Sequence, residues 1–379
     1  MTNRRGTGEG SITQLPDGRW QARIDLGYVN CKRVRKAYFG TNRAEAAKKL
    51  NAAIAERAKG QPVAVEKQTL QQFLTRWLDD TVATSVRPRT AIRYRELVTL
   101  HILPTLGRTQ LMKLTPQDLQ ALYAAKLAQG LAPRTVGHIH RVLHRALGQA
   151  VRWGLVVRNV CDAVDPPKVP RGEIRALSPE EAKRFLTAAV GDPFEALYVL
   201  ALTSGMRQGE LLGLKWQDID LGQGVIQVRR TLGRVKGQGF VESEPKSSAG
   251  RRRIVLAPLA VQALRDHWDR QCDQRLERGM LPGADSLVFG NSLGNPVGPQ
   301  NMIYRSFRKV LAKAGLPVMR FHDLRHSAAT LLLAMGTHPK IVQELLGHSQ
   351  ISLTLDTYSH VLPGLQAEAI GKLGALLAE

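Results

Sequence analysis

The sequence predicts a mostly α-helical, multidomain protein with small β-sheets. At 379 residues the chain exceeds the usual size of a single hydrophobic core, so two or three domains are expected. Apolar residues recur with helical spacing over most of the chain and with strand spacing only in short runs. A proline-rich stretch at 165–172 is typical of a linker between domains.

Residues 1–62 are expected to form a small basic module of strands and one helix. The runs at 20–24 and 34–39 have the composition of strands, and Thr41 or Asn42 can cap the helix that follows. Basic residues lie on the strands themselves and not only in the loops. This favours contact with DNA phosphates over a merely solvated face. The contact candidates are Arg19, Arg23, Arg33 and Arg35.

Residues 68–165 are expected to form a helical domain. Apolar side chains from Leu70 to Leu78 line one face of a first helix, Thr115-Pro116 begins another, and Pro133 begins a third. The polar faces of these helices carry many arginines. By themselves such faces indicate only a solvated surface.

A third domain, 175–379, is expected after the linker. Ser178-Pro179-Glu180-Glu181 forms a capping box with proline at the first helical position, so this domain opens with a helix. Further helices are predicted around 194–202, 259–278 and 301–314 and from 324 onward, and strands at 225–230 and 252–256. The domain is therefore mainly helical with a small antiparallel sheet.

The charge balance points to a polyanionic partner. Lys and Arg number 54 against 32 Asp and Glu, a formal net charge of +22. Duplex DNA is the densest polyanion in a cell, although charge alone leaves a ribosome-associated or merely basic protein open. Three widely spaced cysteines argue against a disulfide framework and a zinc site. The sequence has no signal-peptide pattern and no apolar run long enough for a bilayer, so a cytoplasmic protein without a membrane partner is expected.

Arginine, histidine and tyrosine are concentrated in short motifs of the last two hundred residues. Arg207 precedes Glu210 by three positions at a predicted helix boundary, and this spacing lets a carboxylate orient a guanidinium. His322 and Arg325 share a helical face by the same spacing. Each pair alone is a weak signal, because such pairs are common on helix surfaces.

A histidine and a tyrosine complete this set. His348 follows a predicted helix end, and Tyr358 lies ten residues later. Two arginines can clamp phosphate oxygens, histidines and a lysine can move protons, and a tyrosine can be a covalent nucleophile. The sequence contains no acidic cluster with metal-site spacing and no nucleotide-binding GxxxxGK[ST] motif. We therefore expect phosphoryl transfer without a metal or another cofactor.

These motifs resemble the signature of the tyrosine recombinase (phage integrase) family. The matching segments are TSGMRQGELLGL around Arg207, HDLRH at 322–326, LGH at 346–348 and the downstream Tyr358. The order of segments also resembles integrases with an N-terminal arm-binding domain and a helical core-binding (SAM-like) domain. The resemblance implies a site-specific DNA recombinase whose catalytic domain is 175–379.

The resemblance also implies roles for the motif residues. Tyr358 would attack the scissile phosphate, giving a 3′-phosphotyrosyl link and a free 5′-hydroxyl on the way to a Holliday junction. Arg207 and Arg325 would clamp the phosphate, with Glu210 as a supporting carboxylate.

The proton-handling residues follow from the same resemblance. His348 would hydrogen-bond the phosphate and His322 would assist proton transfer at the tyrosine. The family's general-acid lysine lies in a β-hairpin loop, where Lys246 is preferred to Lys236 because a predicted strand follows it at the right distance. The nearby histidines His326, His338 and His360 are interpreted as non-catalytic.

Double-stranded DNA carrying attachment sites is the expected partner. The two larger domains would hold the duplex, and the contact candidates in the helical domain are Arg89, Arg134 and Arg141. A homotetramer on DNA is expected, with the amphipathic tail at 362–377 packed on a neighbouring subunit or on its own domain. A host DNA-bending protein and an excisionase are the expected accessory partners. A chromosome-dimer resolvase, a transposon recombinase and a catalytically inactive DNA-binding regulator are the alternative interpretations.

Overall fold

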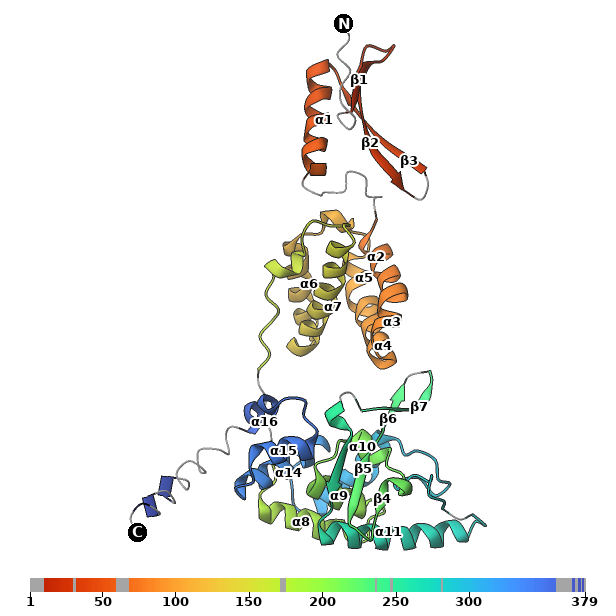
Figure 1. Ribbon diagram of the computed structural model, residues 1–379, viewed down its shortest axis with the longest axis vertical. Coiled ribbons are helices and arrows are strands. Elements are labelled where there is room, and N and C mark those ends of the chain that lie inside the picture. Colours follow the sequence, from red (N-terminus) through yellow and green to blue (C-terminus); the bar gives the residue numbers. More distant parts are fainter. Residues whose placement is uncertain are drawn as a thin grey trace. The chain divides into compact units, whose positions relative to one another are not determined.

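The computed structural model describes residues 10–29, 32–58, 68–170, 175–235, 237–245, 248–280 and 282–358, with five further positions after 369. For residues 26–29, 32–34, 56–58, 248 and 356–358 it describes the backbone and not the side chains. The chain divides into two compact units, residues 1–171 and 172–379. The predicted fold class, mostly α with small antiparallel sheets, is confirmed (Figure 1).

The first unit begins with a three-stranded antiparallel sheet and one helix. Strands β1 (Ser11–Gln14), β2 (Trp20–Val29) and β3 (Lys32–Gly40) pair in that order, and α1 (Arg43–Ala58) covers one face (Figure 1). The apolar side chains of β2 alternate inward and pack on α1, with a core of Ala22, Ile24, Ala46, Leu50 and Ala53. The strand β1 was not predicted from the sequence.

The second part of this unit is a helical domain. Its elements are α2 (Leu70–Arg76), η1 (Trp77–Val82), α3 (Ala83–Ser85), α4 (Pro88–Leu97), η2 (Val98–Ile102), α5 (Leu103–Leu106), η3 (Leu111–Lys113), α6 (Pro116–Ala128), α7 (Pro133–Arg152) and η4 (Val160–Ala163). Thr69 and Thr115 cap α2 and α6 with reciprocal side-chain and backbone hydrogen bonds. One face of α7 enters the core through Val136, Ile139, Val142, Leu143, Ala146 and Leu147.

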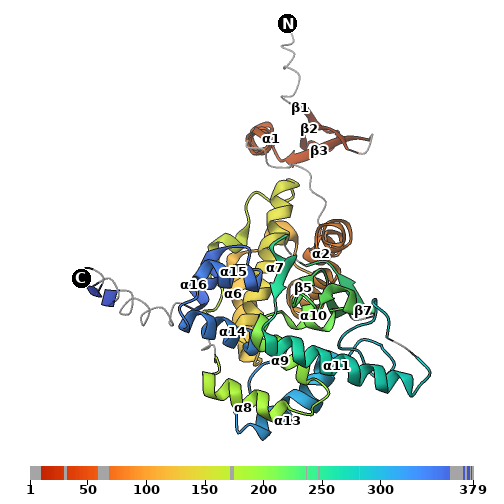
Figure 2. The ribbon, with the colours of Figure 1, turned by 60° about the horizontal axis from the view of Figure 1, so that its bottom comes forward.

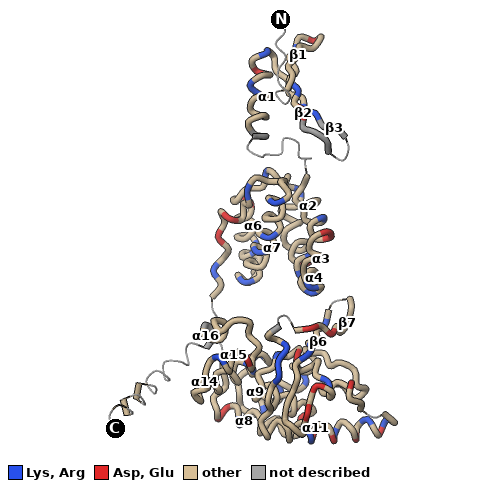
Figure 3. The backbone as a smooth tube through the Cα atoms, in the orientation of Figure 1, with Lys and Arg blue, Asp and Glu red and all other residues tan. Residues whose placement is uncertain are grey.

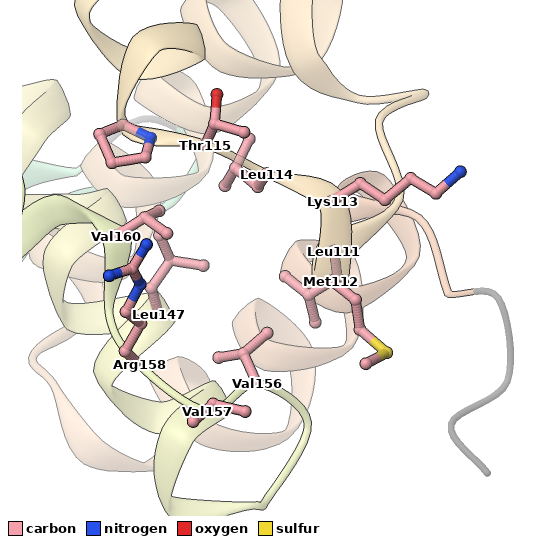
Figure 4. Close-up of a pocket in the computed structure, with 11 residues that line it drawn as sticks. Leu111, Met112, Lys113, Leu114, Thr115, Leu147, Val156, Val157, Arg158 and Val160 are labelled. Carbon is pink, nitrogen blue, oxygen red and sulfur yellow. The ribbon is translucent and has the colours of Figure 1, made fainter. Parts of the chain in front are cut away.

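A surface pocket of about 430 Å³ lies in this helical domain, between η3 and the segment after α7 (Figure 4). Leu111, Leu114, Leu147 and Val156 supply apolar lining, and Lys113 and Arg158 also border it. All residues that line it belong to the first unit, and none of them is a catalytic candidate. Its largely apolar lining is unsuited to phosphate chemistry.

The second unit contains helices around two small antiparallel sheets. Its elements are α8 (Pro179–Ala189), α9 (Glu195–Ser204), α10 (Gln208–Leu212), η5 (Trp216–Asp218), β4 (Ile219–Asp220), β5 (Val225–Val228), β6 (Thr231–Val235), β7 (Gly239–Ser243), η6 (Ser248–Gly250), β8 (Arg252–Val255), α11 (Pro258–Leu276), α12 (Pro299–Met302), η7 (Ile303–Phe307), α13 (Arg308–Lys313), α14 (His322–Ala334), α15 (Pro339–Leu346) and α16 (Ile351–Tyr358). One sheet has the order β4-β5-β8, and β6 and β7 form a separate hairpin.

Helix α9 is the centre of this unit. Its residues are almost all buried, and it packs against α8, α11 and α14 (Figure 2). A helix that is apolar all round is stable only when other elements cover every side. The predicted capping box at Ser178 is present, since Ser178 Oγ accepts the N–H of Glu181. Helices α14, α15 and α16 follow one another in contact, so the three C-terminal motifs come together beside the end of α9.

Candidate active site

Arg207 is the N-cap residue of α10, and two residues separate it from the end of α9. Its Nη1 donates to Oε1 of Glu210 at 2.8 Å and its Nη2 to the carbonyl oxygen of Gly347 at 3.1 Å. The Arg207 backbone N–H also donates to Oε2 of Glu210 at 2.9 Å. The Arg207 side chain remains 40% exposed, whereas that of Glu210 is 3% exposed. The guanidinium is therefore fixed in place and still accessible to a ligand.

The Glu210 carboxylate is held in its charged form. Burial raises the pKa of this carboxyl. The Arg252 guanidinium, followed by the Arg207 backbone N–H and guanidinium, together lower the pKa by more than burial raises it, so the pKa lies below its usual value. A buried carboxylate needs such partners, because an unpaired charge is costly to desolvate. The predicted supporting contact between Glu210 and Arg207 is present in the structure.

Arg325, on α14, is almost wholly buried at 3% exposure. Its Nη1 donates to the carbonyl oxygen of Gly205 and its Nη2 to that of Leu346, each at 2.7 Å. Gly205 caps the C-terminus of α9 and Leu346 ends α15, so two helix C-termini point at one cation. The negative ends of the two helix dipoles offset the cost of burying this charge.

The C-terminus of α15 collects three arginines. The carbonyl oxygens at the end of a helix lack helical partners. Here the carbonyl of Leu345 accepts from Arg252, that of Leu346 from Arg325 and that of Gly347 from Arg207. These arginines come from β8, α14 and the start of α10, so one helix end fixes their mutual positions.

Two glycines make this close assembly sterically feasible. Gly205 and Gly347 have φ values of +60° and +65°, in the left-handed region that favours glycine. A Cβ added to Gly205 would lie 2.6 Å from Cδ2 of Leu346. One added to Gly347 would lie 2.8 Å from the carbonyl oxygen of Ala249 and 3.0 Å from Nη1 of Arg252. The glycines in both motifs thus serve packing as well as turning.

His348 follows Gly347 and contacts the next helix. Its Nδ1 lies 2.9 Å from Oγ1 of Thr354, which is fully buried on α16. Burial lowers the pKa of His348 to about 4, and Arg325 and then Arg207 add to this effect. The ring is therefore neutral at pH 7 and near both phosphate-clamp candidates.

His322 begins α14 and lies in contact with a second histidine. The rings of His322 and His326 meet edge to face with centroids 5.0 Å apart. The pKa of His322 is lowered because neighbouring atoms displace water from its partly exposed ring, and then by the charges of Arg325 and other groups. Burial, followed by His322, lowers the pKa of His326 to about 4. Both rings belong to the same positively charged surroundings.

The nucleophile and lysine candidates are only partly covered by the structure. The backbone of Tyr358 ends α16, which packs against α15, but its side chain lies outside the described residues. Lys246 and Lys236 also lie outside them, so the choice between these lysines stays a prediction. Lys236 falls between β6 and β7, and Lys246 falls between β7 and β8.

The predicted DNA-contact arginines belong to the first unit, whereas the arginines at the end of α15 belong to the second. Arg19, Arg23 and Arg35 are exposed; Arg19 pairs with Asp17 at 2.6 Å, and Arg35 lies 3.8 Å from Asp25. The side chain of Arg33 is outside the described residues. On α4 and α7, whose Lys and Arg are blue in Figure 3, Arg89, Arg134 and Arg141 are all exposed.

An arginine-lined hollow in the second unit was not predicted. It has a volume of about 490 Å³ and is lined by Gln227, Val228, Arg229, Arg251, Arg252 and Arg253. In the β5–β8 ladder Arg253 is opposite Gln227, and both are exposed. On β8, Arg252 is on the same strand face as the buried Ile254, and Arg253 is on the opposite, exposed face. The period-two alternation of side chains along a strand could have indicated this difference.

The comparison with protein families identifies the fold. A model of the phage integrase family matches residues 175–364, half of the chain, and a model of the N-terminal SAM-like domain of phage integrases matches residues 69–127. The chain belongs to the phage integrase family. It is a site-specific DNA recombinase, a DNA strand transferase, as predicted from the motifs.

Similar recombinases span nearly the whole length of this one. The tyrosine recombinase XerC-like protein of Caldanaerobacter subterraneus is 31% identical over 365 residues, covering 92% of this chain and 93% of that protein. A putative prophage phiRv2 integrase of Mycobacterium tuberculosis is 32% identical over 381 residues, covering 97% and 95%.

Solved structures of integrases share the fold of this recombinase. The Tn1549 transposon integrase in complex with transposon right end DNA has a TM-score of 0.69 at 24% identity, covering 81% of this chain and all of that one. The lambda integrase tetramer bound to a Holliday junction has a TM-score of 0.54 at 19% identity, covering 94% and 97%.

No helix among the described residues is long and apolar enough to cross a membrane. Within the same ranges no group of three or more His, Cys, Asp and Glu side chains is arranged to hold a metal ion.

Proposed function

We propose that this recombinase is a phage or mobile-element integrase that cleaves and rejoins DNA through a 3′-phosphotyrosine at Tyr358. The observation that carries the proposal is the arrangement at the end of α15. Arg207 and Arg325 donate to successive main-chain carbonyls there, and His348 follows immediately in the chain. Donors fixed in advance stabilise a charged transition state without reorganisation.

In the proposed reaction the Tyr358 hydroxyl oxygen attacks the scissile phosphorus. A bond forms between this oxygen and phosphorus while the bond from phosphorus to the 5′-oxygen breaks. His322 accepts the tyrosine proton, and Lys246 gives a proton to the departing 5′-oxygen. Because the phosphotyrosine keeps the bond energy, attack by a 5′-hydroxyl of the other DNA strand reverses the step without ATP or a metal.

Arg207 and Arg325 would offset the negative charge of the pentavalent phosphorus. A neutral His348 has one ring proton, and in the proposed tautomer this proton is on Nε2, so that Nδ1 accepts from the Thr354 hydroxyl 2.9 Å away. The Nε2–H then donates to a non-bridging oxygen. The low pKa of His348, about 4, supports this neutral form at pH 7 in the DNA-free protein.

Duplex DNA carrying attachment sites is the proposed partner. The open face of the N-terminal sheet, with Arg23 and Arg35, and the arginines of α4 and α7 would contact phosphates. We assign residues 1–62 to arm-type DNA, 68–165 to the core site and 175–379 to catalysis. The similarity to the SAM-like domain of phage integrases supports the second assignment.

Recombination involves two duplexes and four strand cleavages, so a homotetramer on DNA is proposed. A host DNA-bending protein and an excisionase would assist and direct it, in the cytoplasm of a bacterial host. The similarity to a putative prophage integrase over 97% of this chain supports the choice of an integrase over a chromosome-dimer resolvase.

The test is covalent trapping on a nicked duplex that carries the element's attachment core, identified from its junctions with the host chromosome. Wild type is expected to give a protein–DNA adduct that survives a denaturing gel, and Tyr358→Phe is expected to bind the same DNA without an adduct. An adduct of undiminished yield in Tyr358→Phe would refute the assignment. Binding without any adduct in wild type would refute the proposed cleavage reaction.

A further inference from the structure

Arg252 is a third arginine at the end of α15, and none of the proposed catalytic roles includes it. Its side chain is 7% exposed and makes three hydrogen bonds. Nε donates to the carbonyl oxygen of Leu345 at 2.6 Å, Nη2 to Oε2 of Glu210 at 2.9 Å, and Nη1 to the carbonyl oxygen of Gly250 at 3.3 Å. One guanidinium therefore joins the start of β8, the start of α10 and the end of α15.

These contacts connect Arg252 through Glu210 to Arg207, the accessible arginine of the site. Glu210 uses Oε1 for the Arg207 guanidinium and Oε2 for both the Arg207 N–H and Arg252. Without Arg252 the buried carboxylate would lose a charged partner and could turn away from Arg207. Removal of Arg252 would also take away the donor to the Leu345 carbonyl. This carbonyl lies at the end of α15, where the next two carbonyls accept from Arg325 and Arg207.

We propose that Arg252 is a positioning residue for strand cleavage, which holds Arg207 and the C-terminus of α15 in the geometry that binds the scissile phosphate. The inference rests on the proposed function, because it deepens the phosphate clamp. Arg252 acts through Glu210 and the Leu345 carbonyl and does not need to touch DNA. A lysine keeps the charge but lacks the fork that reaches both acceptors.

The alternative is that Arg252 only stabilises the folded domain. The two roles predict different effects of an Arg252 substitution on the cleavage rate when the charge of the scissile phosphate is removed. A methylphosphonate at the scissile position replaces a charged non-bridging oxygen with a methyl group, so it reduces the need for Arg207. A residue that acts through Arg207 should matter less on this substrate, whereas a fold-stabilising residue should matter equally on both.

The experiment measures single-turnover strand cleavage by the full chain at saturating DNA, on a phosphodiester and on the matched methylphosphonate. We expect Arg252→Ala to slow phosphodiester cleavage by about 10- to 100-fold, as removal of an orienting partner does elsewhere. On the methylphosphonate the loss should fall to about threefold or less, in parallel with Arg207→Ala. Arg252→Lys should give a smaller loss with the same substrate dependence.

Arg275→Ala is the control, because Arg275 is also a buried arginine of the same unit, with 6% of the whole residue exposed, and it donates to Ser286. It should cleave both substrates like wild type. An equal loss for Arg252→Ala on the two substrates, or no loss on the phosphodiester, would overturn the proposal. If Arg252→Ala does not fold, Arg252→Lys decides by the same criterion. Absence of cleavage by wild type would instead refute the proposed function.

Discussion

The arginines at the end of α15 and those on the surface of the first unit differ in what holds them. Arg207, Arg252 and Arg325 donate to main-chain carbonyls, and two of them also contact the buried Glu210. Arg23 and Arg89 lie on exposed faces of a strand and a helix. We infer that the first group is set for chemistry before DNA arrives. The second group supplies charge that can adapt to the DNA backbone.

The largest effect is expected at Arg325. Arg325→Ala removes a cation that two helix C-termini hold in place, so cleavage should fall by at least about 1000-fold at saturating DNA. Single-turnover cleavage of the nicked duplex measures this loss. Arg270→Ala, which changes a part-exposed arginine of α11, is the control and should cleave normally. Near-normal cleavage by Arg325→Ala would remove the distinction between fixed and adaptable arginines.

A smaller effect should follow from crowding the same helix end. Gly347→Ala adds a Cβ near the Ala249 carbonyl and Arg252 and forces alanine into the left-handed region, at a cost of about 1–3 kcal/mol. Displacing the helix end should also slow cleavage by about 100-fold. Gly336→Ala, at φ +79° with open space around its Cβ, has the backbone strain without the collision. Equal cleavage rates in the two variants would show that the close contact at Gly347 is unimportant.

Burial of His326, to which the neighbouring His322 adds, predicts a pH dependence of stability. The pKa of His326 is about 4 in the folded protein and about 6.5 in the unfolded chain, which therefore binds more protons between these values. Stability should thus fall as the pH drops from 6.5 towards 4. Calorimetric unfolding at pH 7 and pH 5 measures how much the free energy of unfolding falls between these pH values. This fall should be smaller for His326→Gln than for wild type, by about 1 kcal/mol. An unchanged drop would mean that His326 is readily protonated in the folded protein.

The smallest effect is expected at a single surface arginine. Arg23→Ala should weaken binding to attachment-region DNA a few-fold and reduce the slope of log affinity against log salt by about 1. Arg43→Ala, on α1 and so on the covered side of the sheet, should leave the slope unchanged. A salt slope for Arg23→Ala equal to that of wild type would remove the open sheet face from the DNA interface.

Local signals were sufficient for much of the fold and for part of the site. The capping residues Ser178 and Thr115 predicted helix starts because their hydrogen bonds span only three residues. The contact of Arg207 with Glu210 was predictable for the same reason, since the two residues are three positions apart. The order of the motifs, which resembles that of tyrosine recombinases, then predicted that Arg325 and His348 belong to the same site as Arg207.

Contacts between distant segments could not be predicted in this way. Arg252 reaches Glu210 across 42 positions and Leu345 across 93. In the sequence it is one of three successive arginines at the start of the predicted strand 252–256, and no role was predicted for it. The hairpin of β6 and β7 was also missed, because its short, glycine-containing strands lack a clear alternation of apolar residues. The hydrogen bond between His348 and Thr354 depends on how α16 packs on α15.

The most direct measurement is to locate the DNA on the trapped protein by mass spectrometry. After digestion with trypsin and nuclease, the peptide 341–372 should carry a nucleotide remnant, because cleavage is expected after Lys340 and Lys372. Fragmentation should locate the remnant on Tyr358. A remnant on another residue, such as Tyr304, or an adduct at a 5′-phosphate, would contradict the proposed 3′-phosphotyrosine mechanism.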